Sequence, residues 1–297
     1  MKTEILIALI AGTILGLMGM MVVAKVTTTS RPSITLSQSP SPSPALAARV
    51  DNKLLSPLPF MSWDDTQIPV KGTAKDGSFV FVVGDTGDMV TSLTDGIFND
   101  TLIGSTGISH YSVFSQNGEK IGETQIARFK GMPTNKQLKF GSVTDLTAES
   151  LQIRGELGTI DQLAFSPNIV VASFIKEPKK VDAHDIAIGD KVAIVVDDSS
   201  KSESLALGVF IVPSDFSIKK YVLHAGTLSA IEKQSITVHL NESDSKAALT
   251  SSTKYFGIKK DGTVRKRTKL IASDTSKAVY FVTEDGQQDI RSIFISE

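Results

Sequence analysis

The segments GSVTDLTAESLQI (residues 141–153) and GTLSAIEKQSITV (residues 226–238) align without a gap and decide the fold of the C-terminal part of the chain. Their glycines lie 85 positions apart, 226 minus 141, and the other matches at this offset are Val143 with Leu228, Leu146 with Ile231, Ser150 with Ser235, Leu151 with Ile236 and Ile153 with Val238. Each copy continues into two apolar strands, GDKVAIVVDD and LALGVFIV in the first, KAVYFVTEDG and IRSIFIS in the second. One register satisfies every apolar position, which predicts tandem copies of one β-unit at residues 136–213 and 220–297.

Each unit resembles a small β-barrel domain of unknown function that occurs in tandem in exported bacterial proteins. The family pattern is G-x-V-x-x-I, a short second strand, a Gly-Asp turn before a third strand, and a final apolar strand. The first copy carries the turn as IAIGDKVAIVV, with Gly189 and Asp190. The second copy has IASDTSKAVYFV, with Ser273 and Asp274 and no glycine, so a looser turn is expected there. The resemblance implies closed or nearly closed barrels, a fold that is neutral about function.

The preceding stretch, residues 59–135, has the periodicity of strands. Phe79, Phe81 and Val83 alternate with Val80 and Val82, so this strand is apolar on both faces, as an inner strand would be. Asp76-Gly77, Asp95-Gly96 and Asn117-Gly118 are typical of tight hairpin turns. About seven short strands separated by such turns predict a β-sandwich.

Residues 56–133 also resemble the bacterial Ig-like repeats found in exported enzymes and surface proteins. The matching segments are IPVKGTA, DGSFVFVV, DGIF and HYSVFSQNGEKIGETQIARFKG. The resemblance implies a spacer or adhesion module rather than an active site.

The N-terminus carries an apolar run, ILIALIAGTILGLMGMMVV, from Ile5 to Val23. A helix of that length spans about 30 Å, the thickness of a bilayer's hydrocarbon core. We therefore predict a transmembrane anchor at residues 1–26, which makes the membrane the first partner. A cleaved secretory signal is the alternative, since Val22 and Ala24 are small residues at the spacing that signal peptidase favours, but the run is longer than a usual signal core.

The topology is not decided by charge, because Lys2 lies beside Glu4 while Lys25 and Arg31 follow the span. We expect a single-pass protein of the cell membrane with its other domains outside the cytoplasm, because the linker and domains are of an extracellular type. Gly12 and Gly16 form a small-xxx-small pair that would suit a helix dimer, although glycine is common in membrane helices. The sequence leaves the oligomeric state open.

Residues 27–58 include SQSPSPSP (residues 37–44), which cannot build a core, and predict a disordered linker. The expected fold class is therefore all-β, an Ig-like sandwich followed by two small barrels, behind one transmembrane α-helix.

The composition excludes several function classes. A net charge of −1 gives no field that would recruit nucleic acid, and the absence of cysteine excludes disulfides and a lipoprotein anchor. The four histidines, His110, His184, His224 and His239, do not lie at zinc-helix spacing. The acidic loop Asp85-Thr86-Gly87-Asp88 has two carboxylates where calcium needs six to eight oxygens, and is interpreted as a turn. We therefore predict no catalytic residue, cofactor or metal, and no enzyme; the sequence leaves open a metal site assembled in space from distant residues.

One basic cluster is a candidate binding site: Arg265, Lys266, Arg267 and Lys269, close to Tyr255. Cations beside aromatic rings bind single-stranded nucleic acid or an anionic wall polymer, whereas a solvated hairpin after Asp261-Gly262 explains the charges equally well. The first functional hypothesis is a surface scaffold, spacer or adhesion module with an envelope protein as partner. The alternative is a component that binds a wall polymer or carbohydrate, for which Trp63 and four tyrosines supply few stacking platforms.

Overall fold

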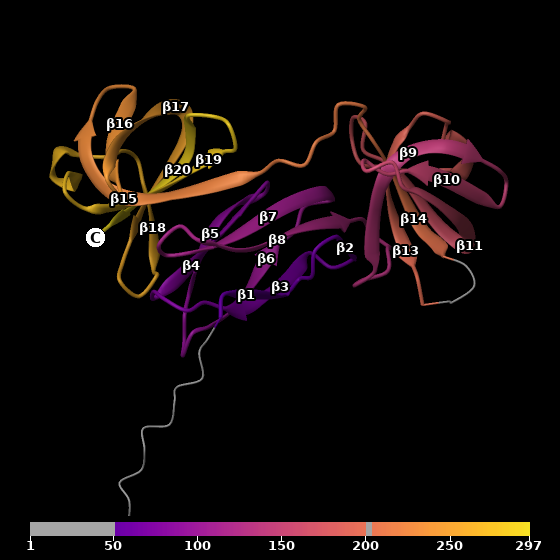
Figure 1. Cartoon of the computed structure of the whole chain (residues 1–297), viewed down its shortest axis with the longest axis horizontal. Helices are drawn as coiled ribbons and strands as arrows, with labels where there is room; N and C mark the ends of the chain where they lie inside the picture. The colour runs from indigo at the N-terminus through magenta and orange to yellow at the C-terminus, as the bar shows by residue number, and fades with distance from the viewer. Residues whose placement is uncertain (1–50, 200–203) are drawn as a thin grey trace, which may run out of the picture. The chain divides into compact units, whose positions relative to one another are not determined.

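The structure is a computed structural model that describes residues 51–199 and 204–297, and the regular structure of these residues is β apart from two short 3-10 helices (Figure 1). Within these ranges, no helix has the length and apolar character needed to cross a membrane. The predicted anchor at residues 1–26, with Gly12 and Gly16, lies outside them, as does most of the predicted linker.

The first part of the described chain has the two facing sheets of an Ig-like sandwich. One sheet has the order β1-β3-β6, made of β1 (Lys53–Ser56), β3 (Gln67–Thr73) and β6 (Ile97–Ile103). The other has the order β5-β4-β7-β8-β2, made of β5 (Gly87–Ser92), β4 (Phe79–Gly84), β7 (Gly107–Ser115), β8 (Lys120–Arg128) and β2 (Met61–Trp63). β1 falls within the stretch 27–58 that composition predicts as linker, and Leu54 packs its side chain against the core of the sandwich.

β4 is buried along its whole length, and its two faces serve different cores. Val80 and Val82 point into the core between the two sheets. Phe79, Phe81 and Val83 pack in a second cluster with side chains of the C-terminal barrel. The predicted inner strand is thus confirmed, with β5 and β7 as its neighbours. The tight turns are confirmed by positive φ angles of 103°, 76° and 88° at Gly77, Gly96 and Gly118.

The rest of the chain forms two five-stranded rings. Barrel 1 has the closed order β9-β10-β11-β14-β13, made of β9 (Gln137–Leu146), β10 (Ser150–Arg154), β11 (Ile160–Ser173), β14 (Leu205–Val212) and β13 (Lys191–Asp197), with β12 (Lys179–Val181) beside β11. Barrel 2 has the closed order β15-β16-β17-β20-β19, made of β15 (Tyr221–Ile231), β16 (Ser235–Leu240), β17 (Ser243–Ile258), β20 (Asp289–Ser296) and β19 (Ala278–Glu284), with β18 (Val264–Arg267) beside β17. In each ring only the third and fifth strands are parallel, which is the arrangement of an OB-type barrel.

The two rings share one register, as the repeat predicts. Val143 pairs with Ile153 in barrel 1, and Leu228 pairs with Val238 in barrel 2. The glycines that open the repeat are required by close approach of two strands. A Cβ atom on Gly141 would lie 2.7 Å from the carbonyl oxygen of Arg154, and one on Gly226 would lie 2.4 Å from that of His239.

The turn before the fourth strand differs from the expectation for the second copy. Gly189 donates its N–H to the carbonyl of Val143, and Ser276 donates to that of Leu228, so Ser276 rather than Ser273 occupies the glycine's place. Ser276 adopts the same left-handed conformation, with φ of 69° against 97° at Gly189. The turn is held by Asp274 in the preceding 3-10 helix (Ala272–Asp274), so it is not a looser one. Barrel 1 has its own 3-10 helix at Ala183–Asp185.

Both barrels contact the sandwich through the same outer face, which we call the docking face. Gly141 pairs with Val192 and Gly226 with Val279, so strands β9 and β13 align with β15 and β19. The docking face of barrel 1 includes Leu138, Phe140, Ala193, Val195 and Phe210, which pack with Ala127 and Phe129 of the sandwich. The corresponding residues of barrel 2 are Leu223, Ala225, Tyr280, Val282 and Phe294, which pack with Phe79, Phe81 and Phe114.

The barrels differ in how their backbones join the sandwich. β2 pairs in parallel with β8, and its Met61 also pairs with Gln137 of β9. The hydrogen-bonded sheet therefore continues from the sandwich into barrel 1. The strands of barrel 2 form a sheet of their own.

Candidate functional site

A groove of about 1060 Å³ lies on barrel 1, beside its docking face. Four segments line it: β9 from Lys139 to Thr144, the β10–β11 turn, the turn before β13, and the connector between the barrels near Phe216. Phe60, which precedes β2, adds a ring from the sandwich side. Large grooves lined mainly by apolar side chains with a few polar groups are the usual form of binding sites.

Three phenylalanine rings gather along the groove. Phe140 and Phe216 stack with a 7° angle between their planes and 6.3 Å between ring centroids. Phe60 meets Phe140 edge to face at 6.0 Å. Lys191 donates a hydrogen bond of 3.3 Å from Nζ to the carbonyl oxygen of Phe216, which fixes the connector over β9. The rings therefore belong to three different parts of the chain and meet only in the fold.

The β10–β11 turn presents an exposed leucine at the groove. Gly155 donates to the carbonyl of Thr159 at 2.9 Å and leaves three residues between them. Leu157, in the middle, is 95% exposed, and Ile188 on the neighbouring turn is 67% exposed. In barrel 2 the corresponding turn has only Asn241 and Glu242 between Leu240 and Ser243. The turn of barrel 1 therefore has an apolar residue at its tip, whereas the corresponding turn of barrel 2 does not.

The charges at the groove largely compensate one another. Lys139 pairs with Asp161 at 2.9 Å and lies 3.8 Å from Asp198. Arg154 and Glu156 carry opposite charges on the β10–β11 side. The groove therefore lacks the one-signed field that would select a highly charged polymer.

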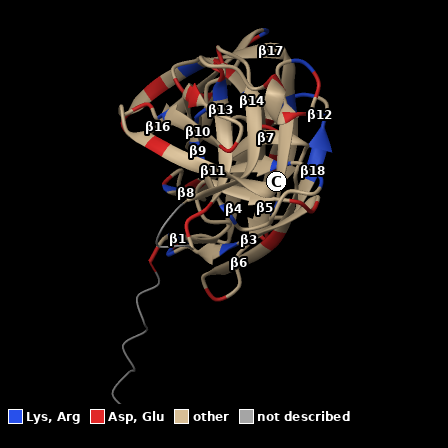
Figure 2. Ribbon diagram, turned by 90° about the vertical axis from the view of Figure 1, so that its right-hand side faces the viewer, with Lys and Arg blue, Asp and Glu red and all other residues tan. Residues whose placement is uncertain are grey.

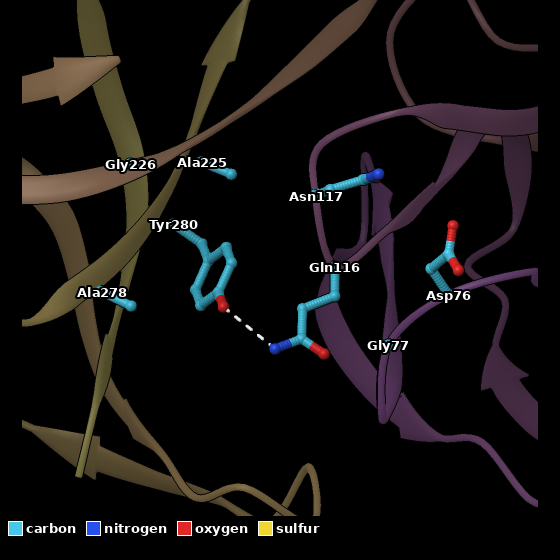
Figure 3. Close-up of a pocket in the computed structure, with 8 residues that line it drawn as sticks. All are labelled: Asp76, Gly77, Gln116, Asn117, Ala225, Gly226, Ala278 and Tyr280. Carbon is cyan, nitrogen blue, oxygen red and sulfur yellow. Dashed lines mark hydrogen bonds between the residues drawn. The ribbon is translucent and has the colours of Figure 1, made fainter. Parts of the chain in front are cut away.

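The corresponding surface of barrel 2 is covered by turns of the sandwich. A pocket of about 420 Å³ there is lined by Ala225, Gly226, Ala278 and Tyr280 of barrel 2 and by Asp76, Gly77, Gln116 and Asn117 of the sandwich (Figure 3). Gln116 points at Tyr280 and donates a hydrogen bond of 3.2 Å from Nε2 to the phenol oxygen (Figure 3). By register, Phe140, Gly141 and Lys191 of the groove are the counterparts of Ala225, Gly226 and Ala278.

The basic residues proposed as a binding site from the sequence lie on β18 and just after it. Figure 2 shows lysine and arginine residues in blue. Arg267 pairs directly across the ladder with Tyr255, so the structure brings these two together. Arg265 and Arg267 share one face of β18 and Lys266 lies on the other, because side chains alternate along a strand. Lys269 follows the strand and is exposed.

Arg267 and Tyr255 are also used by the fold itself. Arg267 donates two hydrogen bonds, of 3.2 and 2.8 Å, to the carboxylate of Asp274, which is completely buried. Burial alone would raise the pKa of Asp274, but hydrogen bonds from the Ile271 N–H, Arg267 and Lys277 hold it below its usual value. The Tyr255 ring packs against the core of barrel 2.

The acidic loop joins the sandwich to barrel 2. Asp85 accepts hydrogen bonds from the hydroxyl of Tyr221 and from the N–H of His110, and Asp88 accepts one from the hydroxyl of Ser292. Arg291 donates to the carbonyl of Gly84, lies 3.5 Å from Asp88, and stacks over the Tyr221 ring at 4.9 Å. We call these residues the interface clamp. Its carboxylates are engaged by protein groups, in keeping with a structural turn.

Other chemistry in the described ranges is sparse. No group of three or more histidine, aspartate or glutamate side chains there is placed to hold a metal ion. The histidines lie on β7, the first 3-10 helix, β15 and β16. Sequence reasoning missed the groove because it counted tryptophan and tyrosine as stacking groups, whereas the rings present are phenylalanines. No sequence signal joins Phe60, Phe140 and Phe216, which are separated by 80 and 76 positions (140 minus 60, 216 minus 140).

Comparison with known proteins gives no family. No protein family matches the chain, and no curated protein matches it either. Among solved structures, the chain is similar to Drosophila Unr CSD456 at 11% identity and a TM-score of 0.20, covering 83% of this chain and 93% of that one. It is also similar to a multidomain Streptococcus pneumoniae protein described as having nucleic acid binding domains, at 12% identity and a TM-score of 0.17, covering 77% and 72%. Likeness at these TM-scores carries no argument about this chain.

Proposed function

We propose that this chain is a non-enzymatic, membrane-anchored scaffold outside the cytoplasm, which holds two related barrels on one Ig-like module and presents a binding groove to a partner in the envelope. The anchor rests on the apolar run from Ile5 to Val23. We further propose that the sandwich belongs to the bacterial Ig-like repeats and the barrels to the tandem exported family. The two-sheet sandwich and the repeated five-stranded ring support these assignments.

One observation carries the scaffold proposal: both barrels bury the same docking face against the sandwich. The Phe81 ring contacts those of Tyr280 at 5.0 Å and Phe294 at 5.2 Å, and the Phe79 ring contacts Tyr280 at 5.9 Å. The interface clamp adds charged hydrogen bonds beside these rings. Modules joined only by flexible linkers have small, polar contacts, whereas a large apolar interface favours a fixed arrangement.

The test uses the absence of cysteine, which allows clean labelling of the full chain. Spin labels placed in pairs at exposed positions of the sandwich, barrel 1 and barrel 2, such as Thr101, Lys180 and Lys266, should give narrow distance distributions in phospholipid nanodiscs. Changing Tyr221 and Arg291 together to Ala should broaden only the distances to barrel 2. Broad distributions in the unchanged chain would contradict a scaffold.

The anchor has a separate test. Alkaline carbonate washing of membranes should leave the full-length chain in the pellet. Release of a shortened chain that begins at Lys25 would replace the anchor with a cleaved signal.

The alternative, binding of a wall polymer or carbohydrate, has weaker support because Arg267 is engaged by Asp274. Its test is sedimentation of the full chain with purified cell wall. Changing Arg265 and Lys266 to Ala should weaken sedimentation if β18 is the site, whereas the matched change of Lys179 and Lys180 on β12 should not. Unchanged sedimentation of both variants would exclude β18.

A further inference from the structure

We propose that the groove of barrel 1 is the docking site for a β-turn of a partner protein that carries an apolar side chain at its tip. The inference rests on the proposed function, since it names the class of partner that the scaffold would hold. Three observations support it: a precedent within the chain, the chemistry of the groove, and its continuity with an existing interface.

The precedent is the corresponding surface of barrel 2, where turns of the sandwich are the occupant. The turn after β7 reaches the barrel so closely that a Cβ on Gly118 would lie 3.2 Å from the carbonyl oxygen of Leu223. Gln116 in the same turn bonds Tyr280. This face of the repeated barrel therefore already receives a hairpin turn once in the molecule. On barrel 1, its counterpart residues Phe140, Gly141 and Lys191 line an open groove.

The chemistry of the groove favours an apolar guest. Where barrel 2 has Ala225, barrel 1 has Phe140, and where barrel 2 has a polar turn, barrel 1 has Leu157. Leu157 and Ile188 are more than half exposed, and exposed apolar side chains clustered at a groove mark interaction sites. Lys139 is neutralised by Asp161, so a charged guest gains little there.

The groove is continuous with an interface that the chain already makes. Phe140 lines the groove and also packs in the cluster that joins barrel 1 to Ala127 and Phe129 of the sandwich. A docked turn would extend this protein-to-protein contact. A sugar polymer fits less well, because Phe140 and Phe216 already stack on each other and so use ring faces that a sugar would need.

The experiment measures binding of defined peptides to the full chain in phosphatidylcholine nanodiscs by fluorescence anisotropy. The probe is a head-to-tail cyclised, dye-labelled peptide of residues 112–123, SVFSQNGEKIGE, with Gln116 and Asn117 both changed to Leu. The unchanged cyclic peptide is the polar-tip control, and a hexamer of N-acetylglucosamine is the carbohydrate arm. We expect saturable binding of the apolar-tip peptide and at least about tenfold weaker binding of the polar-tip peptide.

Two substitutions place the binding in the groove. Leu157→Ser should weaken it by about tenfold or more, and because Leu157 is 95% exposed this change leaves the fold intact. The matched change Glu242→Ser, on the corresponding turn of barrel 2, should leave binding unchanged. Phe216→Ala should also weaken binding, with near-ultraviolet circular dichroism as the check on folding.

Three results would overturn the proposal: no saturable binding of the apolar-tip peptide, equal binding by the Leu157→Ser variant, or binding of the oligosaccharide but not the peptide. If the spin-label distances stay narrow in any of these cases, the scaffold stands and only the docking site is lost. Broad distances would instead overturn the scaffold, whatever the peptide does.

Discussion

Tyr221, the first residue of β15, donates its hydroxyl hydrogen to a carboxylate oxygen of Asp85 in the turn between β4 and β5. The other carboxylate oxygen accepts the backbone N–H of His110 at 2.7 Å. Burial first, and then the hydrogen bond to Asp85, raise the pKa of Tyr221 far above its usual value. The phenol therefore stays protonated and remains a donor throughout the neutral range, which makes it a permanent element of the interface clamp.

Tyr221→Phe should lower the free energy of unfolding by about 1.5 to 3 kcal/mol, the range for a hydrogen bond to a charged group. Urea unfolding of the full chain in nanodiscs measures this change. Tyr255→Phe is the matched control, since Tyr255 contributes its ring to the barrel 2 core. That variant should stay within about 0.5 kcal/mol of the unchanged chain. Equal effects of the two substitutions on the free energy of unfolding would show that the hydrogen bond from Tyr221 to Asp85 does not stabilise the fold.

A buried histidine, His110, and a half-buried one, His224, predict a loss of stability in mild acid. The pKa of His110 is lowered, and burial is the largest cause. The charges of Glu123 and Asp85 act to raise this pKa, whereas the charge of Lys120 lowers it further. Burial also lowers the pKa of His224, whose ring stacks on Phe281 at 4.5 Å. Because the folded state favours the neutral rings, their stabilisation is complete above pH 6.5 and is lost as the pH falls towards the lowered values.

The measurement is the pH dependence of unfolding between pH 7 and pH 5. Each histidine can contribute at most about 1.4 kcal/mol per pH unit. His110→Gln and His224→Gln should each flatten the slope, and the double variant should flatten it further. A slope unchanged in the double variant would assign the acid sensitivity to other groups.

Arg267→Ala should be strongly destabilising, by about 3 kcal/mol or more, because it leaves the buried Asp274 carboxylate with Lys277 as its remaining cation. Arg265→Ala, two residues away on an exposed stretch of β18, should change stability by no more than about 0.5 kcal/mol. Thermal unfolding of the two variants gives the comparison. Similar small effects would mean that the basic run is only a solvated surface.

Gly141→Ala and Gly226→Ala should each destabilise their barrel by about 1 to 3 kcal/mol, because the new Cβ meets a backbone carbonyl of the neighbouring strand. Gly155→Ala is the control, since its Cβ would meet the side-chain hydroxyl of Thr159 at 2.8 Å, and that group can rotate away. Unfolding free energies in urea decide the order. If both alanine variants are as stable as the unchanged chain, close approach of two strands does not explain why both repeats begin with glycine.

The sequence predicts well those features that one strand or one ladder determines. The alternation from Phe79 to Val83 predicts a strand with two buried faces, and the matched pairs Val143–Leu228 and Ile153–Val238 predict the common register of the barrels. What covers the second face of β4 does not follow from alternation, because Tyr280 and Phe294 are about two hundred positions away.

Features that are assembled from distant segments cannot be predicted from the pattern of any one segment. The sequence predicts only a turn at Asp85 and Asp88, because their partners Arg291 and Ser292 lie about two hundred positions away. The groove depends on Phe216, which lies in a connector without regular structure of its own, and on one extra residue in the β10–β11 turn. The contacts of the acidic loop and the groove both depend on tertiary packing, which the periodicity of a single segment does not predict.

Because Met61 pairs with both β8 and β9, the two barrels should respond differently to a pulling force. A pull exerted between the N-terminal side and barrel 1 loads the backbone hydrogen bonds beside the pairing with β9, from Ser62 to Lys136 and from Leu138 to Phe60, together with the apolar contacts of the docking face. Barrel 2 is joined to the sandwich through side-chain contacts, and these can be peeled apart one after another. Under tension the chain should therefore release barrel 2 at a lower force and keep barrel 1, with its groove, under load.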